Sequence, residues 1–196
     1  AAYAQALVDA LRAGRLEVFS AGEAAFSGLQ GDAAALNVAI QALQDSKATT
    51  RRLAAEMLGK MQADSAIPAL TRLLSDPEAD VRTSAVAALG ALNANSELEA
   101  IIAHLDDPEE QVRQKVLSVI AQLNPPVSAP LIEKLNGLLN HDSSIAVQMQ
   151  AAITLSKLSL GEQVIPNLIH WLNSKDSQTR ISALMAIKEI PNSIGG

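Results

Sequence analysis

Acidic and basic side chains recur at fixed intervals along this chain, and they are the first residues whose pattern could carry chemistry. Arg51, Arg82 and Arg113 are spaced by 31 residues, and an aspartate precedes each arginine by six positions. These aspartates are Asp45, Asp76 and Asp107. One interpretation is a row of acid or anion sites. We favour a structural ladder, because an aspartate before a helix can cap its free N–H groups and an arginine fork pairs readily with carboxylates.

The remaining candidates for catalysis or metal binding lack the arrangement that such chemistry needs. The three histidines, His104, His141 and His170, share no spacing and have no His–Glu pair, whereas a metal site needs several converging ligands. No serine lies in a G-x-S-x-G context, and residues 28–32 (GLQGD) lack the Lys-Ser/Thr end of a phosphate loop. The chain has no cysteine for thiol catalysis or disulfides. We therefore predict no catalytic residue, no metal and no cofactor.

The composition predicts an all-α protein. Of the 196 residues, 48% are hydrophobic and only 2% aromatic, and Ala, Leu, Gln, Glu and Lys are good helix formers. A formal charge of −6, with no basic run longer than Arg51-Arg52, argues against nucleic acid as a partner. No apolar stretch approaches the ~18 residues that span a membrane, and residues 1–14 lack the basic start of a signal peptide. We expect a cytoplasmic protein.

The elements that hold the aspartates and arginines recur as one repeated unit. Each unit is predicted to contain a helix, a tight turn and a second helix. In the clearest copy, the turn is Asp76-Pro77, and apolar residues follow at helical spacing from Val81 to Leu92. The same pattern continues around Gln148 and Arg180, where Gln148 replaces the arginine of the fourth unit and Ser174 the aspartate of the fifth.

The repeat sets the predicted boundaries. We expect helix pairs at about 33–62, 64–93, 95–123, 127–159 and 162–190, after an N-terminal helical cap or degenerate repeat at 1–32 and before a tail at 191–196. The prolines of residues 124–130 (NPPVSAP) should end one helix and start the next, with a local bend of the stack there. Trp171 aligns with Leu73, so we assign it to the core.

The motif D-P-x-x-x-V-R-x-x-A-x-x-A-L-G, with its period of 31 to 35 residues, resembles HEAT repeats over roughly residues 33–190. This resemblance implies a right-handed α-solenoid of about five helix pairs. It also implies that Asp45/Arg51, Asp76/Arg82 and Asp107/Arg113 form a ladder between neighbouring units, half broken at Gln148 and Ser174. The short period, and Leu58-Gly59 and Leu89-Gly90, are similar to the HEAT variant of phycobilin lyase subunits.

In a HEAT stack the second helices line the concave surface, as the resemblance implies. The positions one, five and nine residues after the repeat arginine change along the chain from charged, through small and polar, to apolar. Exposed apolar patches usually mark an interface, and methionine suits adaptable contacts. Cover by the chain's own C-terminus or by further repeats is the alternative. The predicted binding residues are Met149, Ile153, Ile181 and Met185, with Ala87, Ala91, Gln114 and Ser118.

These features favour a protein-binding scaffold or adaptor that is not an enzyme and whose partner is another protein. The alternative implied by the lyase resemblance is a chaperone-like or lyase-type subunit that handles a bilin on a phycobiliprotein. Under that alternative, Ala87, Ala91 and Ser118 leave room for a flat tetrapyrrole, and the bilin would be the one bound cofactor. A third interpretation is a fragment of a larger HEAT scaffold.

Overall fold

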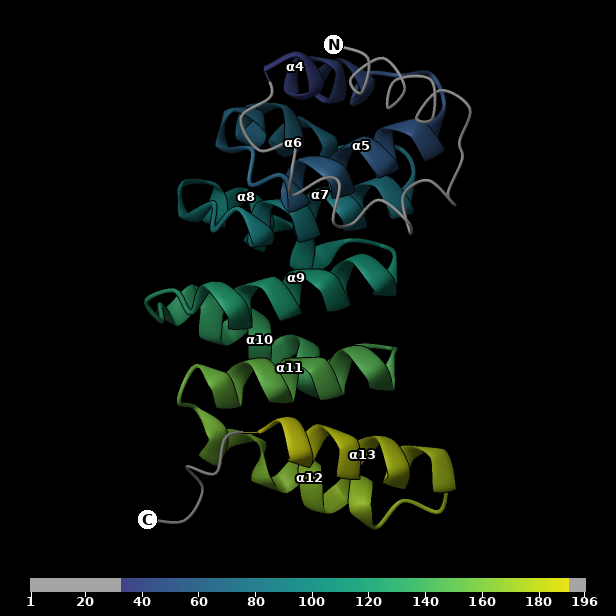
Figure 1. The fold of residues 1–196 in the computed structure, drawn as a ribbon. Helices are drawn as coiled ribbons and strands as arrows, with labels where there is room; N and C mark the ends of the chain where they lie inside the picture. The colour runs from purple at the N-terminus through teal and green to yellow at the C-terminus, as the bar shows by residue number, and fades with distance from the viewer. Residues whose placement is uncertain (1–32, 191–196) are drawn as a thin grey trace. The chain divides into compact units, whose positions relative to one another are not determined.

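The structure is a computed structural model that describes residues 33–190. The predicted N-terminal cap at 1–32 and tail at 191–196 lie outside the described residues. The described part consists of α-helices, short 3₁₀ helices and turns, without a β-strand (Figure 1). The all-α prediction is therefore confirmed. The chain divides into two compact units, residues 1–101 and 102–196.

The first unit contains two helix pairs whose second helices pack on each other. Helix α4 packs on α5, α6 packs on α7, and α5 packs on α7. Their bounds are α4, Ala33–Ala42; α5, Ala48–Lys60; η1, Asp64–Ala66; α6, Ile67–Leu73; α7, Ala79–Ala91; and η2, Asn95–Glu97. Pro68 lies in the first turn of α6, where its missing N–H leaves no helical bond unmade.

In the second unit, α9, α11 and α13 lie side by side in one layer, and α10 and α12 lie behind them (Figure 1). The bounds are η3, His104–Asp106; α9, Glu110–Leu123; α10, Ala129–His141; α11, Ile145–Lys157; η4, Gly161–Val164; α12, Ile165–Leu172; and α13, Ser177–Glu189. Helix α8, Leu98–Ala103, spans the division between the units. The prolines of residues 124–130 separate α9 from α10, as predicted, and Trp171 is buried in the core, as predicted.

The repeat aspartate shapes the turn that precedes each of the second helices α5, α7, α9 and α11. The Oδ1 atom of Asp76 accepts the N–H of Glu78 at 3.0 Å, and Asp142 accepts the N–H of Ser144 at 2.8 Å. Asp45 and Asp107 accept the N–H two residues later in the same way. That N–H belongs to the residue just before the helix, so our expectation of a direct helix cap needs correction. The carboxylate closes an Asx turn, and the turn sets the start of the helix.

Each of these helices also ends in the same conformation. Gln62, Asn93, Asn124 and Ser159 follow α5, α7, α9 and α11, and all four have positive φ between 46° and 65°. A left-handed residue at this place lets its neighbours bond back to the last helical carbonyls. For example, the N–H of Ala63 donates to Leu58 O at 3.2 Å. The repeated pattern therefore sets both the residue where each of these helices begins and the residue where it ends.

The core between α5 and α7 depends on one glycine. A Cβ atom added to Gly59 would lie 3.0 Å from the Cα atom and 3.2 Å from the Cβ atom of Ala88. Such distances are shorter than ordinary packing contacts, so the two helices approach closely only because this position has no side chain. Around it, Leu53, Leu58 and Leu89 are fully buried.

Candidate functional site

The repeat arginine of the first unit joins two successive turns. Arg51 donates from Nε to Asp76 Oδ2 at 2.7 Å and from Nη2 to Asp76 Oδ1 at 2.8 Å. Its Nη1 donates to the backbone carbonyls of Asp45 at 2.9 Å and Ser46 at 3.1 Å. Two parallel bonds from a guanidinium to one carboxylate are the strongest geometry that such a pair can adopt.

The second unit repeats this arrangement with the same atoms. Arg113 donates from Nε to Asp142 Oδ2 at 2.8 Å and from Nη2 to Asp142 Oδ1 at 2.9 Å. Its Nη1 donates to the carbonyls of Asp107 at 2.7 Å and Pro108 at 3.0 Å. The aspartate six residues before an arginine therefore offers its backbone carbonyl, and the carboxylate comes from the next turn along the chain.

These contacts shift the pKa values of arginine and aspartate side chains in the ladder. Burial by itself raises the pKa of Asp76, but the hydrogen bonds from Arg51 and Glu78 and the nearby positive charges outweigh it, so the net pKa is lowered. The hydrogen bond to Asp142 likewise raises the pKa of Arg113 against the opposing effect of burial. The carboxylate of Asp76 is thus held in its ionised form, and that of Asp142 accepts two hydrogen bonds from Arg113, so neither is free for acid–base work.

The ladder changes at α11. Gln148 stands where the other units have arginine, and its Nε2 donates to the carbonyl of Asp142 at 2.8 Å. The glutamine thus reproduces the bond of the arginine to its own turn. In the turn before α13, Ser174 stands where the aspartate would be, and its Oγ accepts the N–H of Asp176 at 3.2 Å. The bidentate pair seen at Arg51 and Arg113 has no counterpart here, since neither of its two charged groups is present.

A groove of about 420 Å³ lies between α11 and α13. Apolar side chains form most of its walls, together with Gln150, Ser182 and Lys188. The apolar lining residues are Ile145, Ala146, Met149, Ile153, Met185 and Ala186. Because Ile145, Met149 and Ile153 are four residues apart, they form one stripe along about 12 Å of α11.

Three of the four apolar residues predicted to form one binding cluster line this groove. Met149 is only 5% exposed and lies at the floor, Ile153 is half-buried, and Met185 is 66% exposed. Ile181 is exposed but does not line the groove. Ile145 was not among the predicted residues but also lines the groove, and its place one helical turn before Met149 was a usable signal.

The other four predicted binding residues lie elsewhere. Ala87 and Ala91 are half-buried on α7 in the first unit, and Gln114 is half-buried on α9 in the second. Ser118 is exposed on α9. None of the four lines the groove between α11 and α13, so their role in binding stays a prediction.

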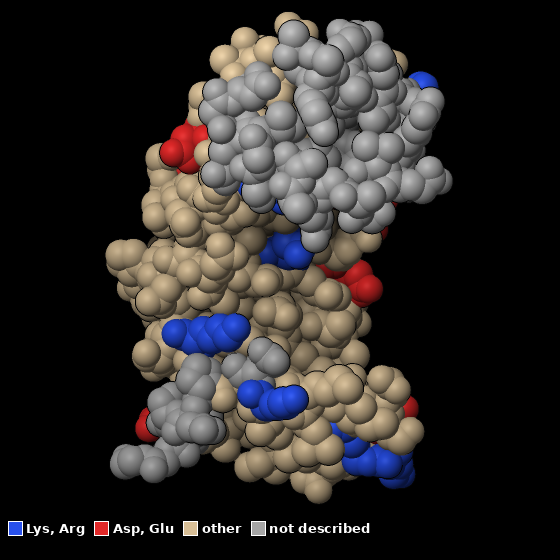
Figure 2. Space-filling view, viewed as in Figure 1, with Lys and Arg blue, Asp and Glu red and all other residues tan. Residues whose placement is uncertain are grey.

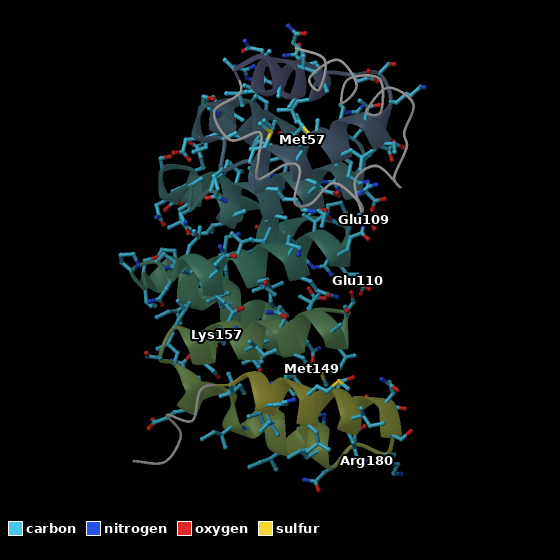
Figure 3. All side chains as sticks on the ribbon, in the orientation of Figure 1. Met57, Glu109, Glu110, Met149, Lys157 and Arg180 are labelled. Atoms are coloured by element: carbon cyan, nitrogen blue, oxygen red, sulfur yellow. The ribbon has the colours of Figure 1, made fainter. Side chains whose placement is uncertain are left out.

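The groove is weakly polar and its one ionisable lining residue is a cation, Lys188. Its walls include no carboxylate and no nucleophile beside a general base. Figure 2 shows that the visible face of the second unit is mostly uncharged, and Figure 3 places Lys157 and Met149 at different points along α11. This chemistry suits recognition of an apolar surface with a negative group nearby.

Within residues 33–190, no three His, Asp or Glu side chains gather as metal ligands. His104 Nδ1 lies 3.5 Å from Asp107 Oδ2 within its own turn. No helix in this part of the chain has the length and apolar character to cross a membrane.

Comparisons with known proteins agree on the fold. A family model described as HEAT repeats matches residues 4–90, 36–108 and 98–188. The complex of CpcE and CpcF of phycocyanin lyase from Nostoc sp. PCC7120 is similar in structure, with a TM-score of 0.57 and 23% identity. That match covers 80% of this chain, which spans 65% of the length of the lyase chain.

An engineered protein and a designed protein are also similar in structure. An engineered protein matches with a TM-score of 0.64, 24% identity and coverage of 95% of this chain and 93% of its own. A designed armadillo repeat protein in complex with peptide (KR)4 matches with a TM-score of 0.55, 19% identity and coverage of 93% and 97%. A comparison with curated protein sequences found no significant match.

Proposed function

Because this chain belongs to the HEAT-repeat family, we propose that it is a protein-binding module without catalytic activity. Its groove between α11 and α13 receives an amphipathic helix of the partner protein. The observation that carries this proposal is the apolar lining of the groove, which includes two methionines and two isoleucines. Repeat proteins commonly bind partners along the surface that successive helices share.

The dimensions of the groove favour a helix. The stripe from Ile145 to Ile153 extends over about two turns, which matches apolar residues at i, i+3/i+4 and i+7 of a bound helix. Met149 and Met185 are unbranched, and their side chains can adjust to the shape of the partner. Lys188 at the groove favours an acidic residue at one end of that helix.

Burial of the apolar groove residues would favour a complex. Complete burial of an exposed Met or Ile side chain contributes about 1.5–3 kcal/mol, and Ile145 and Met185 are both exposed at present. Part of this gain offsets the loss of translational and rotational freedom on association. We therefore expect moderate affinity that depends strongly on Met185.

The test compares two variants of the full chain as bait in an extract of the host, with captured proteins identified by mass spectrometry. Met185→Glu places a charge in the groove, whereas the matched control Val127→Glu places it on an exposed residue before α10. We expect at least one partner to be retained by the wild type and the control and lost with Met185→Glu. Equal capture by all three proteins, with unchanged circular dichroism, would contradict a binding role for the groove.

A second candidate function is supported by the likeness to the phycocyanin lyase complex. The groove volume falls within the range of small-molecule sites, about 300–1,000 Å³, and Lys188 could pair with a carboxylate of a bilin. Co-expression with bilin synthesis tests this candidate. A visible absorption band that co-purifies with the wild type and is lost in Met185→Glu supports bilin handling, and a colourless protein argues against it.

A further inference from the structure

The groove between α11 and α13 has polar side chains without a partner. Gln150, Ser182 and Lys188 line it, and none of their side chains makes a hydrogen bond or an ion pair within residues 33–190. The lysine can only donate, and the serine hydroxyl and the glutamine amide can donate as well. No carboxylate lines the groove to accept from them. The polar part of the groove therefore lacks an anionic acceptor.

The equivalent interface between α5 and α7 has such an acceptor. There Glu56 Oε1 accepts a hydrogen bond from Ser84 Oγ at 3.1 Å and another from Arg52 Nη1 at 2.5 Å. The serine belongs to α7, whereas the glutamate and the arginine belong to α5. One carboxylate thus lies between the two second helices and satisfies the serine hydroxyl.

The groove has the same serine but not the carboxylate. Ser182 of α13 lies two residues after the repeat arginine, which is the position of Ser84 in α7. Ile153 of α11 lies five residues after the repeat position, where α5 has Glu56. Both Ser182 and Ile153 line the groove and are half-buried. The exchange of a carboxylate for an apolar side chain has therefore left the serine hydroxyl without its acceptor, among apolar walls.

Lys188 adds a positive charge to the same groove. It lies six residues after Ser182, which corresponds to about 9 Å along the axis of α13. Charges attract each other more strongly beside a partly buried apolar surface than in open water. Since no acidic lining residue offsets the lysine, the groove favours an anionic acceptor over a neutral one.

We propose that the acidic residue of the bound helix lies within its apolar face, and that Ser182 and Lys188 determine this specificity. The carboxylate takes the place that Glu56 has between α5 and α7, where it accepts a hydrogen bond from Ser182 Oγ and is attracted by Lys188. Apolar residues of the same helix cover Met149 and Met185. This inference rests on the proposed function of the groove, and it adds that the partner helix has one Asp or Glu among its apolar anchors.

The first experiment measures this selectivity with two synthetic peptides. Each is a fluorescein-labelled amphipathic helix of about 14 residues with a leucine face, and the two differ only in one residue within that face, which is Glu in one peptide and Gln in the other. Fluorescence anisotropy with the full chain gives the two Kd values. We expect the Glu peptide to bind about tenfold more tightly.

The outcome separates this inference from the proposed function. Equal Kd values for the two peptides would overturn the role of the acidic residue. If Met185→Glu then still weakened both peptides, the groove would remain a binding site for apolar helices. If neither peptide bound, both the inference and the proposed function would be overturned.

Two variants assign the preference to its residues. Ser182→Ala and Lys188→Gln should each reduce it from about tenfold to about threefold, and Lys188→Gln should also remove its dependence on salt. A structural defect of the groove would weaken both peptides equally and leave their ratio unchanged. The matched control, Lys175→Gln, removes a charge from an exposed residue before α13 and should keep the full preference. An unchanged ratio in Ser182→Ala and Lys188→Gln would overturn the assignment.

A third variant supplies the carboxylate from within the chain. Ile153→Glu places it at the position of Glu56 in α5, where it can accept the hydrogen bond of Ser182 and repel a second carboxylate. We expect this variant to lose the preference for the Glu peptide. Ile153→Met is the matched control and should retain it, because its side chain stays apolar. A full preference in Ile153→Glu would overturn the proposed place of the carboxylate.

The last experiment distinguishes a partner protein from the chain itself. A photo-crosslinking amino acid replaces Ile153 in the full chain, both in the purified protein and in cells of the host. We expect cross-links in the cells to a helix of another protein that has Asp or Glu among its apolar residues. Cross-links in the purified protein to another part of the same chain, or to a second copy, would overturn the assignment to a partner. Lack of any cross-link in the cells would do the same.

Discussion

Helices α5 and α7 pack tightly, whereas α11 and α13 leave a groove between them, although each pair consists of second helices from consecutive repeats. Between α5 and α7, Arg51 donates two hydrogen bonds to the carboxylate of Asp76, and Gly59 allows Ala88 to approach closely. Glu56 also accepts a hydrogen bond from Ser84 at 3.1 Å across the same interface. Between α11 and α13 the arginine and the aspartate are both replaced, and a groove of about 420 Å³ opens.

In the tightly packed pair a charged pair lies at one end of the helix and a small residue lies near the other. At the position of Gly59, α11 has Ser156, a buried residue whose Oγ has no hydrogen-bond partner among the described residues. A buried hydroxyl without a partner costs free energy. The α11–α13 interface is therefore the less stable of the two, and it is also the one that provides a binding groove.

The largest expected effect is the loss of an intact ladder pair. Arg113→Met removes the two bonds to Asp142 and leaves a largely buried carboxylate without its cation, so we expect the free energy of unfolding to fall by about 3 kcal/mol. Gln148→Met, at the same position of the next repeat, removes one bond to a carbonyl and should cost about 1 kcal/mol. Urea unfolding measures both, and equal losses would contradict the difference between a ladder position that has the charged pair and one that lacks it.

The second-largest expected effect comes from Gly59, the small residue between α5 and α7. Gly59→Leu forces a side chain against the backbone of Ala88 and should destabilise the protein by about 2 kcal/mol. Gly137→Leu is the matched control, because a Cβ atom at Gly137 in α10 meets no atom within 4 Å. Leucine is a better helix former than glycine, so the control should be neutral or stabilising by up to about 1 kcal/mol. Thermal unfolding of both variants separates close packing from helix propensity.

A smaller effect should come from restoring the ladder where it is broken. Gln148→Arg combined with Ser174→Asp rebuilds the pair between α11 and α13, and we expect a gain of about 1 kcal/mol that neither single change gives. The restored pair should draw the two helices together. Binding of any partner that depends on Met185 should then weaken. A stabilised double variant with unchanged partner affinity would show that the ladder does not control the groove.

The smallest expected effect is a dependence of the free energy of unfolding on pH. The folded pKa of Asp76 is lower than that of an ordinary carboxyl group, about 3.9. Its ionised form therefore stabilises the folded state above that pH, and the contribution disappears as the pH falls through the folded pKa. The difference in unfolding free energy between wild type and Asp76→Asn should shrink from pH 7 to pH 3. Asp176→Asn, at the exposed cap of α13, should show a smaller change over the same range.

Much of the fold could be predicted from local pattern. The turn aspartate, the following arginine and the apolar positions from Val81 to Leu92 repeat with a period that only paired helices explain. The prolines of residues 124–130 marked the break between α9 and α10 for an equally local reason, the loss of an N–H and a fixed φ. Of the four apolar residues predicted to form one cluster, Met149, Ile153 and Met185 line one groove and Ile181 does not, and their role in binding stays a prediction.

The sequence by itself determined the helix pairs, the turns and the residues available to each repeat, because these depend on neighbours within one or two helical turns. Only the tertiary structure decided that Arg51 binds the carboxylate of Asp76 and the carbonyl of Asp45. It also decided that Met149 and Met185 share a groove while Leu184 lies on an uncovered face. Those outcomes depend on the separation and rotation of helices more than 20 residues apart, which packing sets and local periodicity does not.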